Sequence, residues 1–543
     1  MNLYLTIFIV SIFTSVFAQE YRGSIYSRYG ENMQPENEFT YAENFLTLNI
    51  QGDNWDVTSE FVYNKPPEYG LKLSGIRTLS FNLVQESWAL YSGHLTAVFG
   101  NGLAFNFFED KSLDFDNRPF GLRVDFDLSE EIQITSLYGR RNEFTSYSPS
   151  ADRTPDILTS YDAGGAQLSY FPEDQDWNSS GYFTLSKFRS PVRMESLNIE
   201  TLSSTIVDTN EQEATIIGSG ITFTYFSDNW EWNIEYGALK KWFDLPLVKQ
   251  EFDGTVLKTV ESISNQTGTV LYSQWIGSLP DHSTLTIEYK LYQYGIESSD
   301  NKINFNRLAS KSLPFNLGPT SLPQHVVGLL ANLTHVVDYG DEVGFNIDYR
   351  KNLGESFLLT GIYSQASRTS ISELKNTQFL PKMDIEYFPF QEWYIELEYS
   401  DITFQNRSFA AFTDYSTDGI SKEQYISFIP FYFSKQMGSY VFSGLLGTQN
   451  VSKSGKNYKN QQVILSVDWK QKLSFSLVTD QTSDPSFDEN ARWISGEISY
   501  KPSSIITLRT NYGAEKGGVR CTGGVCRYIS PFDGMRLMLE VRF

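Results

Sequence analysis

Long apolar runs are scarce in this sequence. Beyond residue 19, serine, threonine, asparagine or glutamate interrupts the apolar stretches. A membrane-spanning helix needs about 20 apolar residues, so the body of the chain is not built from such helices. Residues 3–17 are the exception, and they have the length of a secretory signal core that ends near Ala18. We expect cleavage before Gln19, which makes residues 1–18 a signal peptide; an N-terminal membrane anchor is the alternative.

Basic residues, histidine and catalytic motifs are also scarce. The sequence has 43 Lys and Arg against 65 Asp and Glu, a net charge of -22, which excludes nucleic acid as a partner because phosphates need a basic surface. Histidine occurs four times, and no G-x-S-x-G, H-E-x-x-H or P-loop motif is present. We therefore expect neither catalysis nor a cofactor. A hydrolase assembled in space at the outer rim is a remote alternative, with His325 or His335 as its base.

Cysteine occurs only as Cys521 and Cys526. In an exported chain this pair favours a local disulfide, since the compartment beyond the inner membrane is oxidising and the surrounding glycines allow a tight reversal. A redox-active pair would have C-x-x-C spacing. A metal site is disfavoured because no histidine or further cysteine lies nearby.

The sequence is rich in aromatic residues, which make up 15% of the chain, and they alternate with polar ones. In residues 393–399, Trp393, Ile395, Leu397 and Tyr399 alternate with Tyr394, Glu396 and Glu398. Residues 230–236 and 285–291 follow the same period of two, which indicates strands. A soluble sandwich could show this pattern, but about 24 such segments occur, mostly of roughly 9–12 residues, the length of tilted membrane strands.

The connections between these segments alternate in length. We assign short turns to residues 51–54, 128–131, 389–391 and 501–504, and longer links to 64–75, 100–118, 142–161, 189–214, 242–266, 405–421 and 514–531. Short periplasmic turns and long external loops give this rhythm. Both ends of the barrel should lie in the periplasm, so the number of strands should be even. The count is even when residues 295–340 form one long external or infolded loop. The predicted fold is all-β: a single large transmembrane antiparallel up-and-down β-barrel over residues 19–543, with about 24 strands in a range of roughly 22–26.

The end of the chain carries a further signal. Met535, Leu537, Leu539, Val541 and Phe543 alternate up to the C-terminus. An apolar last strand that ends in an aromatic residue is typical of proteins read by the barrel assembly machinery. We therefore expect the outer membrane as the location, with outer-membrane lipid and that machinery as partners.

Alternation also assigns charged residues to the lumen. These candidates are Glu60, Glu231, Glu235, Glu288, Lys290, Asp348, Arg350, Glu396, Glu398, Asp468, Glu497, Arg509, Arg536, Glu540 and Arg542. Pairing across the barrel wall is the favoured interpretation. A bias of the pore toward cations is the alternative, and both can hold together.

One loop, residues 100–121, is rich in glycine and carboxylates. Glu109, Asp110, Asp114 and Asp116 could supply oxygen ligands to a cation, although the spacing does not match an EF-hand. The favoured interpretation is a structural one, in which the loop folds into the lumen with Arg118 or Arg123 pairing. Substrate recognition is a third interpretation.

Two stretches are similar to a known family. They are GHLTAVFGNGLAFNFFEDKSLDFDNRPFGLRVDF (93–126) and GAEKGGVRCTGGVCRYISPFDGMRLMLEVRF (513–543). Both resemble an uncharacterised family of outer-membrane barrels from Bacteroidetes-type bacteria, a domain of unknown function. The resemblance implies location and architecture, and it assigns no catalytic residues.

A channel or transporter for small solutes is the leading hypothesis, because a barrel of this width encloses a lumen that side chains alone cannot fill. The alternative is a scaffold for surface loops, or a sheath for a periplasmic or surface partner. A TonB-dependent receptor would need a plug domain before the barrel, whereas strands are predicted directly after the signal, which argues against that class.

Overall fold

A computed structural model describes residues 20–543 of the chain with some gaps. The gaps are residues 35–37, 112–113, 146–156, 199–202, 253–256, 295–312, 324, 326, 332–336, 338–341, 368–389, 417–421, 488–490 and 523–524.

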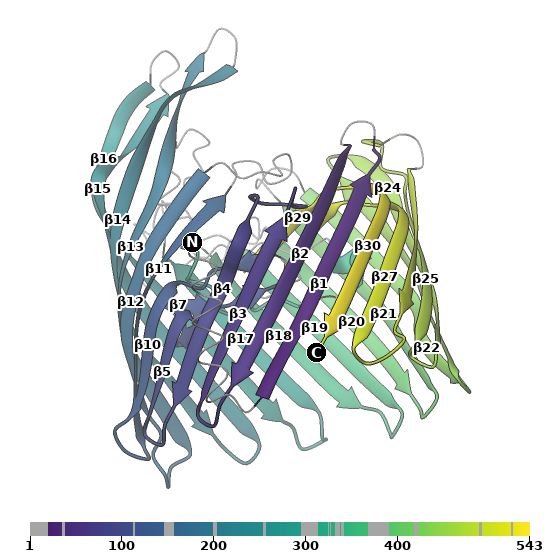
Figure 1. Cartoon of the computed structure of the whole chain (residues 1–543), viewed down its shortest axis with the longest axis horizontal. Coiled ribbons are helices and arrows are strands. Elements are labelled where there is room, and N and C mark those ends of the chain that lie inside the picture. Colours follow the sequence, from purple (N-terminus) through teal and green to yellow (C-terminus); the bar gives the residue numbers. More distant parts are fainter. Residues whose placement is uncertain are drawn as a thin grey trace.

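The protein is a closed β-barrel (Figure 1). Its 24 strands form one antiparallel sheet, and the first strand pairs with both the second and the last. The barrel strands are β1 (Glu20–Asn32), β2 (Phe39–Gln51), β3 (Trp55–Asn64), β4 (Ser74–Val84), β5 (Trp88–His94), β10 (Phe120–Asp127), β11 (Ile132–Thr145), β12 (Ile157–Tyr170), β13 (Trp177–Asn198), β14 (Ser203–Phe226), β15 (Trp230–Phe252), β16 (Leu257–Ser278), β17 (Thr284–Gln293), β18 (Glu342–Asn352), β19 (Phe357–Ser367), β20 (Phe390–Ser400), β21 (Phe404–Ser416), β22 (Lys422–Met437), β23 (Tyr440–Lys453), β24 (Lys456–Trp469), β25 (Leu473–Thr482), β26 (Arg492–Tyr500), β27 (Ile506–Glu515) and β30 (Phe532–Arg542). The predicted fold class is confirmed.

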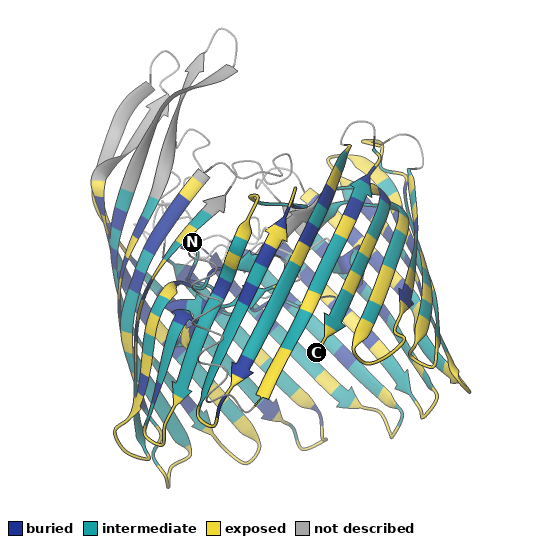
Figure 2. Ribbon diagram, in the orientation of Figure 1, coloured by how far each residue is buried: buried dark blue, intermediate teal, exposed yellow. Residues whose placement is uncertain are grey.

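Alternation along each strand separates an apolar outer surface from a polar inner one. In β20 the side chains of Trp393 and Ile395 are 54% and 55% exposed on the outside, whereas Tyr394 and Glu396 are buried. Figure 2 shows this banding of exposed and buried residues around the wall. Hydrocarbon is the natural solvent for the outer face, because apolar and polar positions alternate in this way in membrane barrels.

Four strands are much longer than expected. β13, β14, β15 and β16 have 22 to 24 residues each, and they rise above the rest of the rim at the long-loop end (Figure 1). Most of the predicted loops 189–214 and 242–266 is therefore strand. A backbone ladder outside the membrane needs no apolar face, so the alternation that marks membrane strands is not required there.

Two other predicted links are wrong. The predicted loop 405–421 is largely strand, because β21 extends to Ser416. Phe390 and Gln391 open β20 and form no turn, while Pro389 lies outside the described residues. The short connection in this region is instead residues 401–403, where Asp401 accepts hydrogen bonds from the backbone N–H groups of Thr403 and Phe404, both at 2.7 Å.

Several short elements belong to links between barrel strands. They are β6 (Ala97–Phe99), β7 (Phe105–Phe107), β8 (Glu109–Asp110), β9 (Phe115–Asp116), the hairpin strands β28 (Gly518–Thr522) and β29 (Val525–Ile529), and the single turn of helix α3 (Gly328–Ala331). Within the described part of the chain, no helix has both the length and the apolarity to cross a membrane.

Candidate functional site

The link between β5 and β10 folds into the barrel (Figure 1). This plug segment, residues 95–119, contains the hairpins β6–β7 and β8–β9. Phe99, Leu103, Phe105 and Phe107 are fully buried at 0% exposure. They share one apolar cluster with inward-facing residues of the wall from β11 to β20, so the plug segment packs directly on the inner surface of the barrel.

A second link, between β17 and β18, meets the plug segment. Residues 313–323, 325 and 327–331 of this link, including α3, are called the roof segment. The Phe315 ring lies 5.5 Å from that of Phe105 and 5.1 Å from that of Tyr161 on the wall. The Asn316 amide donates to the backbone carbonyls of Leu103 and Ala104, each at 2.7 Å. The two links therefore form one packed unit, although they are far apart in the sequence.

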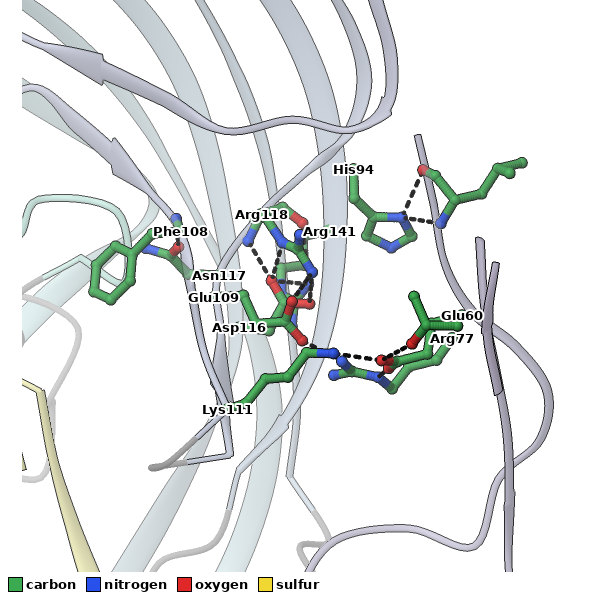
Figure 3. Close-up of polar contacts among 12 residues, drawn as sticks. Glu60, Arg77, His94, Phe108, Glu109, Lys111, Asp116, Asn117, Arg118 and Arg141 are labelled. Atoms are coloured by element: carbon green, nitrogen blue, oxygen red, sulfur yellow. Dashed lines mark hydrogen bonds and ion pairs between the residues drawn. The ribbon is translucent and has the colours of Figure 1, made fainter. Parts of the chain in front are cut away.

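Charged residues tie the plug segment to the wall of β3 and β4 (Figure 3). Arg77 of β4 contacts both Glu60 of β3 and Glu109 of the plug segment. Lys111 also reaches Glu60, at 2.5 Å. Arg118 lies 2.8 Å from Glu109, which extends the network along the plug segment. We call this set of residues the ionic anchor.

The ionic anchor continues to β1 and β11. Arg118 lies 2.9 Å from Asp116, and Arg141 of β11 donates to the Arg118 carbonyl at 3.0 Å. Asp114 lies 3.4 Å from Arg28 of β1. Burial raises the pKa of Asp116, but the hydrogen bond from Arg118 and the charge of Arg141 outweigh it and hold that pKa below its ordinary value. The carboxylate thus stays ionised at neutral pH.

The opposite side of the plug segment is held at a single turn. The backbone N–H of Asn101 donates to Glu235 at 2.6 Å, and the N–H of Gly100 donates to Gln167 at 3.0 Å. The Tyr182 hydroxyl donates to the other Glu235 oxygen at 2.8 Å. Gly100 has a φ of 61°, and a Cβ there would lie 2.2 Å from the Glu235 carboxylate. We call these contacts of Gly100 and Asn101 with Gln167 and Glu235 the turn clamp, and they require glycine at position 100.

A cavity of about 400 Å³ lies between the roof segment and the inner wall of β17–β21. The roof side contributes Leu322, Pro323, His325, Val327 and Leu330. The wall side contributes Glu288, Asn346, Asp348, Arg350, Leu358, Thr360, Ile362, Tyr394, Glu396, Glu398, Arg407 and Phe409. Several of these wall residues lie within a few positions of the short turns, so the cavity is on the short-turn side of the roof segment.

The predicted lumen residues fall into distinct environments. Glu60 and Glu235 contact the plug segment. Lys290, fully buried, pairs with Glu342 at 2.5 Å and contacts the carbonyl of Thr320. The cavity is lined by Glu288, Asp348, Arg350, Glu396 and Glu398.

The remaining predicted lumen residues lie elsewhere on the wall. Arg536 contacts Glu515 and Glu68. Arg542 pairs with Glu540 at 2.7 Å, and Asp468 accepts a hydrogen bond from the backbone N–H of Gln471 at 2.7 Å. Glu231, Glu497 and Arg509 lie on β15, β26 and β27.

The carboxylates predicted as a cation loop lie in or beside the ionic anchor. Glu109, Asp114 and Asp116 face arginines, and Asp110 follows in β8. Arg123 pairs with Asp125 at 2.6 Å and donates to the carbonyl of Thr96 at 2.8 Å, and Glu109, Asp114 and Asp116 pair with other arginines. Among the described residues, no group of three or more His, Cys, Asp or Glu side chains is placed to hold a metal ion.

The histidine and cysteine predictions rest on less of the structure. His325 contacts Glu392, with its ring 4.9 Å from that of Tyr394, while His335 lies outside the described residues. The β28–β29 register places Cys521 opposite Cys526, and the disulfide stays a prediction.

Some contact residues were missed at the level of sequence. Arg28, Arg77 and Gln167 contact plug-segment atoms, and Tyr182 donates to Glu235, which holds the plug segment. Each lies at an inward position of an alternating strand, so their orientation could have been read from the period of two. Their contact partners could not be predicted from the sequence, because the path of the plug segment inside the barrel is not specified by any local pattern.

The closed wall, the apolar outer face and the short and long ends define the class: a transmembrane β-barrel of the outer-membrane kind. Residues 15–157 and 441–543 match the model of a family of unknown function, DUF6029. No curated protein matches the sequence.

Solved structures show the same fold at low identity. A mutant of the ferric enterobactin receptor PfeA from Pseudomonas aeruginosa is 9% identical with a TM-score of 0.51, over 96% of this chain and 80% of that chain. The same receptor in complex with BCV-L6 is 9% identical with a TM-score of 0.50, over 96% and 81%. The copper transporter OprC gives 10% identity and a TM-score of 0.49, over 96% and 80%.

Proposed function

We propose that this protein is an outer-membrane channel or transporter that passes small solutes through a lumen constricted by its own loops. The observation that carries the proposal is the plug segment, which is fixed to β3 and β4 by the ionic anchor and to β12, β13 and β15 by the turn clamp. Contacts at both sides of one segment span the lumen and narrow the path through it.

Several further assignments belong to this proposal. Residues 1–18 act as a cleaved signal peptide, so the mature chain begins at Gln19 and the short turns face the periplasm. Residues 295–340 belong to one long link between β17 and β18, of which the roof segment is a described part. The named activity of one fold neighbour also favours transport, since it is a ferric enterobactin receptor. Mass spectrometry of the mature N-terminus tests the cleavage site.

Conductance in planar bilayers tests the proposal. The wild-type protein is compared with one variant that lacks residues 295–340 and with another in which residues 97–116 are replaced by a Gly/Ser linker of equal length. Removal of either constriction should raise single-channel conductance. Retention of the barrel is checked by heat-modifiable migration in gels.

The second candidate function is a scaffold or sheath that transports nothing. The four long strands that project beyond the rim favour it, because they offer β-structure outside the membrane. No conductance in all three proteins, with stable co-purification of a second protein, would overturn the transport proposal and support the scaffold.

A further inference from the structure

We propose that the cavity beneath the roof segment is a binding site for a small organic cation with an apolar body. This inference rests on the proposed function, because it takes the lumen as the path of a solute. It goes further by naming the chemical class of that solute.

The wall of the cavity carries four carboxylates, Glu288, Asp348, Glu396 and Glu398, against the two guanidinium groups of Arg350 and Arg407. Glu288 accepts hydrogen bonds from Tyr272 at 2.7 Å, Gln274 at 3.2 Å and Asn346 at 3.1 Å, all of them uncharged donors. Glu398 lies opposite Arg407 in the β20–β21 register and its charge acts on that guanidinium, but the hydrogen bonds of Arg407 go to Glu396. Neutral donors hold the Glu288 carboxylate in place without placing an opposite charge beside it.

The basic residues of the cavity are already engaged. Arg350 pairs with Asp348 at 2.7 Å, and both guanidinium contacts of Arg407 go to Glu396. His325, the remaining basic group of the lining, contacts Glu392. The charges left over are therefore negative, and they select against anions.

The opposite side of the cavity is apolar. Leu322, Val327 and Leu330 of the roof segment face it, and Ile362 and Phe409 flank it on the wall. The volume of about 400 Å³ lies within the range of roughly 300–1,000 Å³ that is typical of small-molecule sites. A bare metal ion would leave this apolar side without a partner, so the arrangement fits an organic cation.

The short-turn rim adds a second, independent observation. All residues of the short turns are described, and the turns from β2–β3 to β20–β21 contain no lysine or arginine. Their carboxylates are Asp53, Glu86, Glu130, Glu131, Glu173, Asp174, Asp176, Asp228, Asp281, Glu355 and Asp401. Of these, Asp281 pairs with Lys351 of β18 at 2.7 Å. The lysines of the short turns are Lys470, Lys472 and Lys501, in the β24–β25 and β26–β27 turns.

The cavity lies on the acidic part of this rim, because its wall is formed by β17–β21. Clustered charge of one sign raises the local concentration of the opposite ion and speeds its association. The rim thus attracts cations to the mouth that leads to Glu288 and Glu398.

Calorimetric titration of the purified full-length protein in detergent tests the proposal. The probes are 1,6-diaminohexane, 1,6-hexanediol and adipate, which share a six-carbon body and differ in charge. The diamine should bind, and the diol and the dianion should bind far more weakly. Glu398→Gln should weaken diamine binding roughly tenfold, as expected for one lost charge-assisted contact.

Glu497→Gln is the matched control, because Glu497 is a predicted lumen residue on β26 that does not line the cavity. It should bind the diamine as the wild type does. Equal binding of all three probes, or equal weakening by both substitutions, would overturn the inference.

Binding and conductance fail separately. Conductance without diamine binding would overturn this inference and leave the channel intact as a proposal. Diamine binding without conductance would overturn the channel proposal and leave the cation site supported. Heat-modifiable migration of each variant shows whether the barrel has formed.

Discussion

Replacing Phe105 by alanine should open the lumen without unfolding the barrel. The Phe105 side chain is 0% exposed, and its ring lies 5.5 Å from Phe99, 5.0 Å from Phe107 and 5.5 Å from Phe315. It also lies over the wall at Gly165, where a Cβ would come within 3.0 Å of the ring. The ring is thus the centre of the contact between the plug segment, the roof segment and the wall.

The size of the effect follows from this burial. Truncating a buried phenylalanine to alanine costs about 3–5 kcal/mol, and each 1.4 kcal/mol changes an equilibrium about tenfold. The cost falls on docking of the plug segment, because the backbone ladder of the barrel does not involve this side chain. The fraction of molecules with a released plug segment should rise by roughly a hundredfold to a thousandfold.

Single-channel recording in planar bilayers measures that change as more frequent or larger openings. Phe120→Ala is the matched control, since Phe120 undergoes the same change on β10 but is 54% exposed on the outer face. The control should conduct as the wild type does. If both variants conduct alike while both barrels keep their heat-modifiable migration, the plug segment does not constrict the path, and the reasoning fails.

Three further predictions concern the plug segment and the last external link. Gly100→Ala should release the turn clamp, because the alanine Cβ would meet Glu235 and the positive φ at this position is costly for alanine. The released plug segment should be cut faster by trypsin after Lys111. The pKa of Asp116 lies below its ordinary value of 3.8, so its contribution to docking is complete above about pH 4 and is lost as pH falls through the lowered pKa. Openings should therefore increase only in that acidic range, and Asp116→Asn should show them at neutral pH. Cys521 and Cys526 should resist alkylation in exported protein until it is reduced.

The barrel could be predicted because its determinant is local. Alternation in a segment such as 393–399 states which side chains face outward, and it needs no knowledge of the partner strand. Residues 535–543 carry the same information for the closing strand. Repeating this reading along the chain gave the strand number that the structure has.

The ends of strands were predicted less well, for a physical reason. β13 continues to Asn198 and β15 to Phe252, beyond the points at which the loops 189–214 and 242–266 were predicted to begin. Outside the membrane, backbone hydrogen bonds hold a hairpin together without apolar alternation. The signal that marks a membrane strand therefore stops before the strand does.

The candidate site depends on contacts that no local pattern contains. Asn106 donates to the carbonyl of Leu317 at 2.8 Å, and Asn117 donates to that of Pro314 at 2.9 Å. Each pair joins links from different parts of the chain. The prediction that residues 100–121 could fold inward named the right segment, but the residues that receive it follow only from three-dimensional register.

The plug and roof segments separate the inward charges into two groups with different roles. Alternation treats Glu235, Lys290, Glu288 and Glu398 alike, as charges facing a wet lumen. Glu235 and Lys290 are instead at 0% exposure. The Asn101 N–H of the plug segment donates to Glu235. Lys290 contacts the Glu342 carboxylate and a carbonyl of the roof segment. Their burial is compensated within the protein, so they hold the constriction in place. Glu288 and Glu398 line the space that the two segments leave uncovered. The charges available to a solute are therefore those that the plug and roof segments leave uncovered.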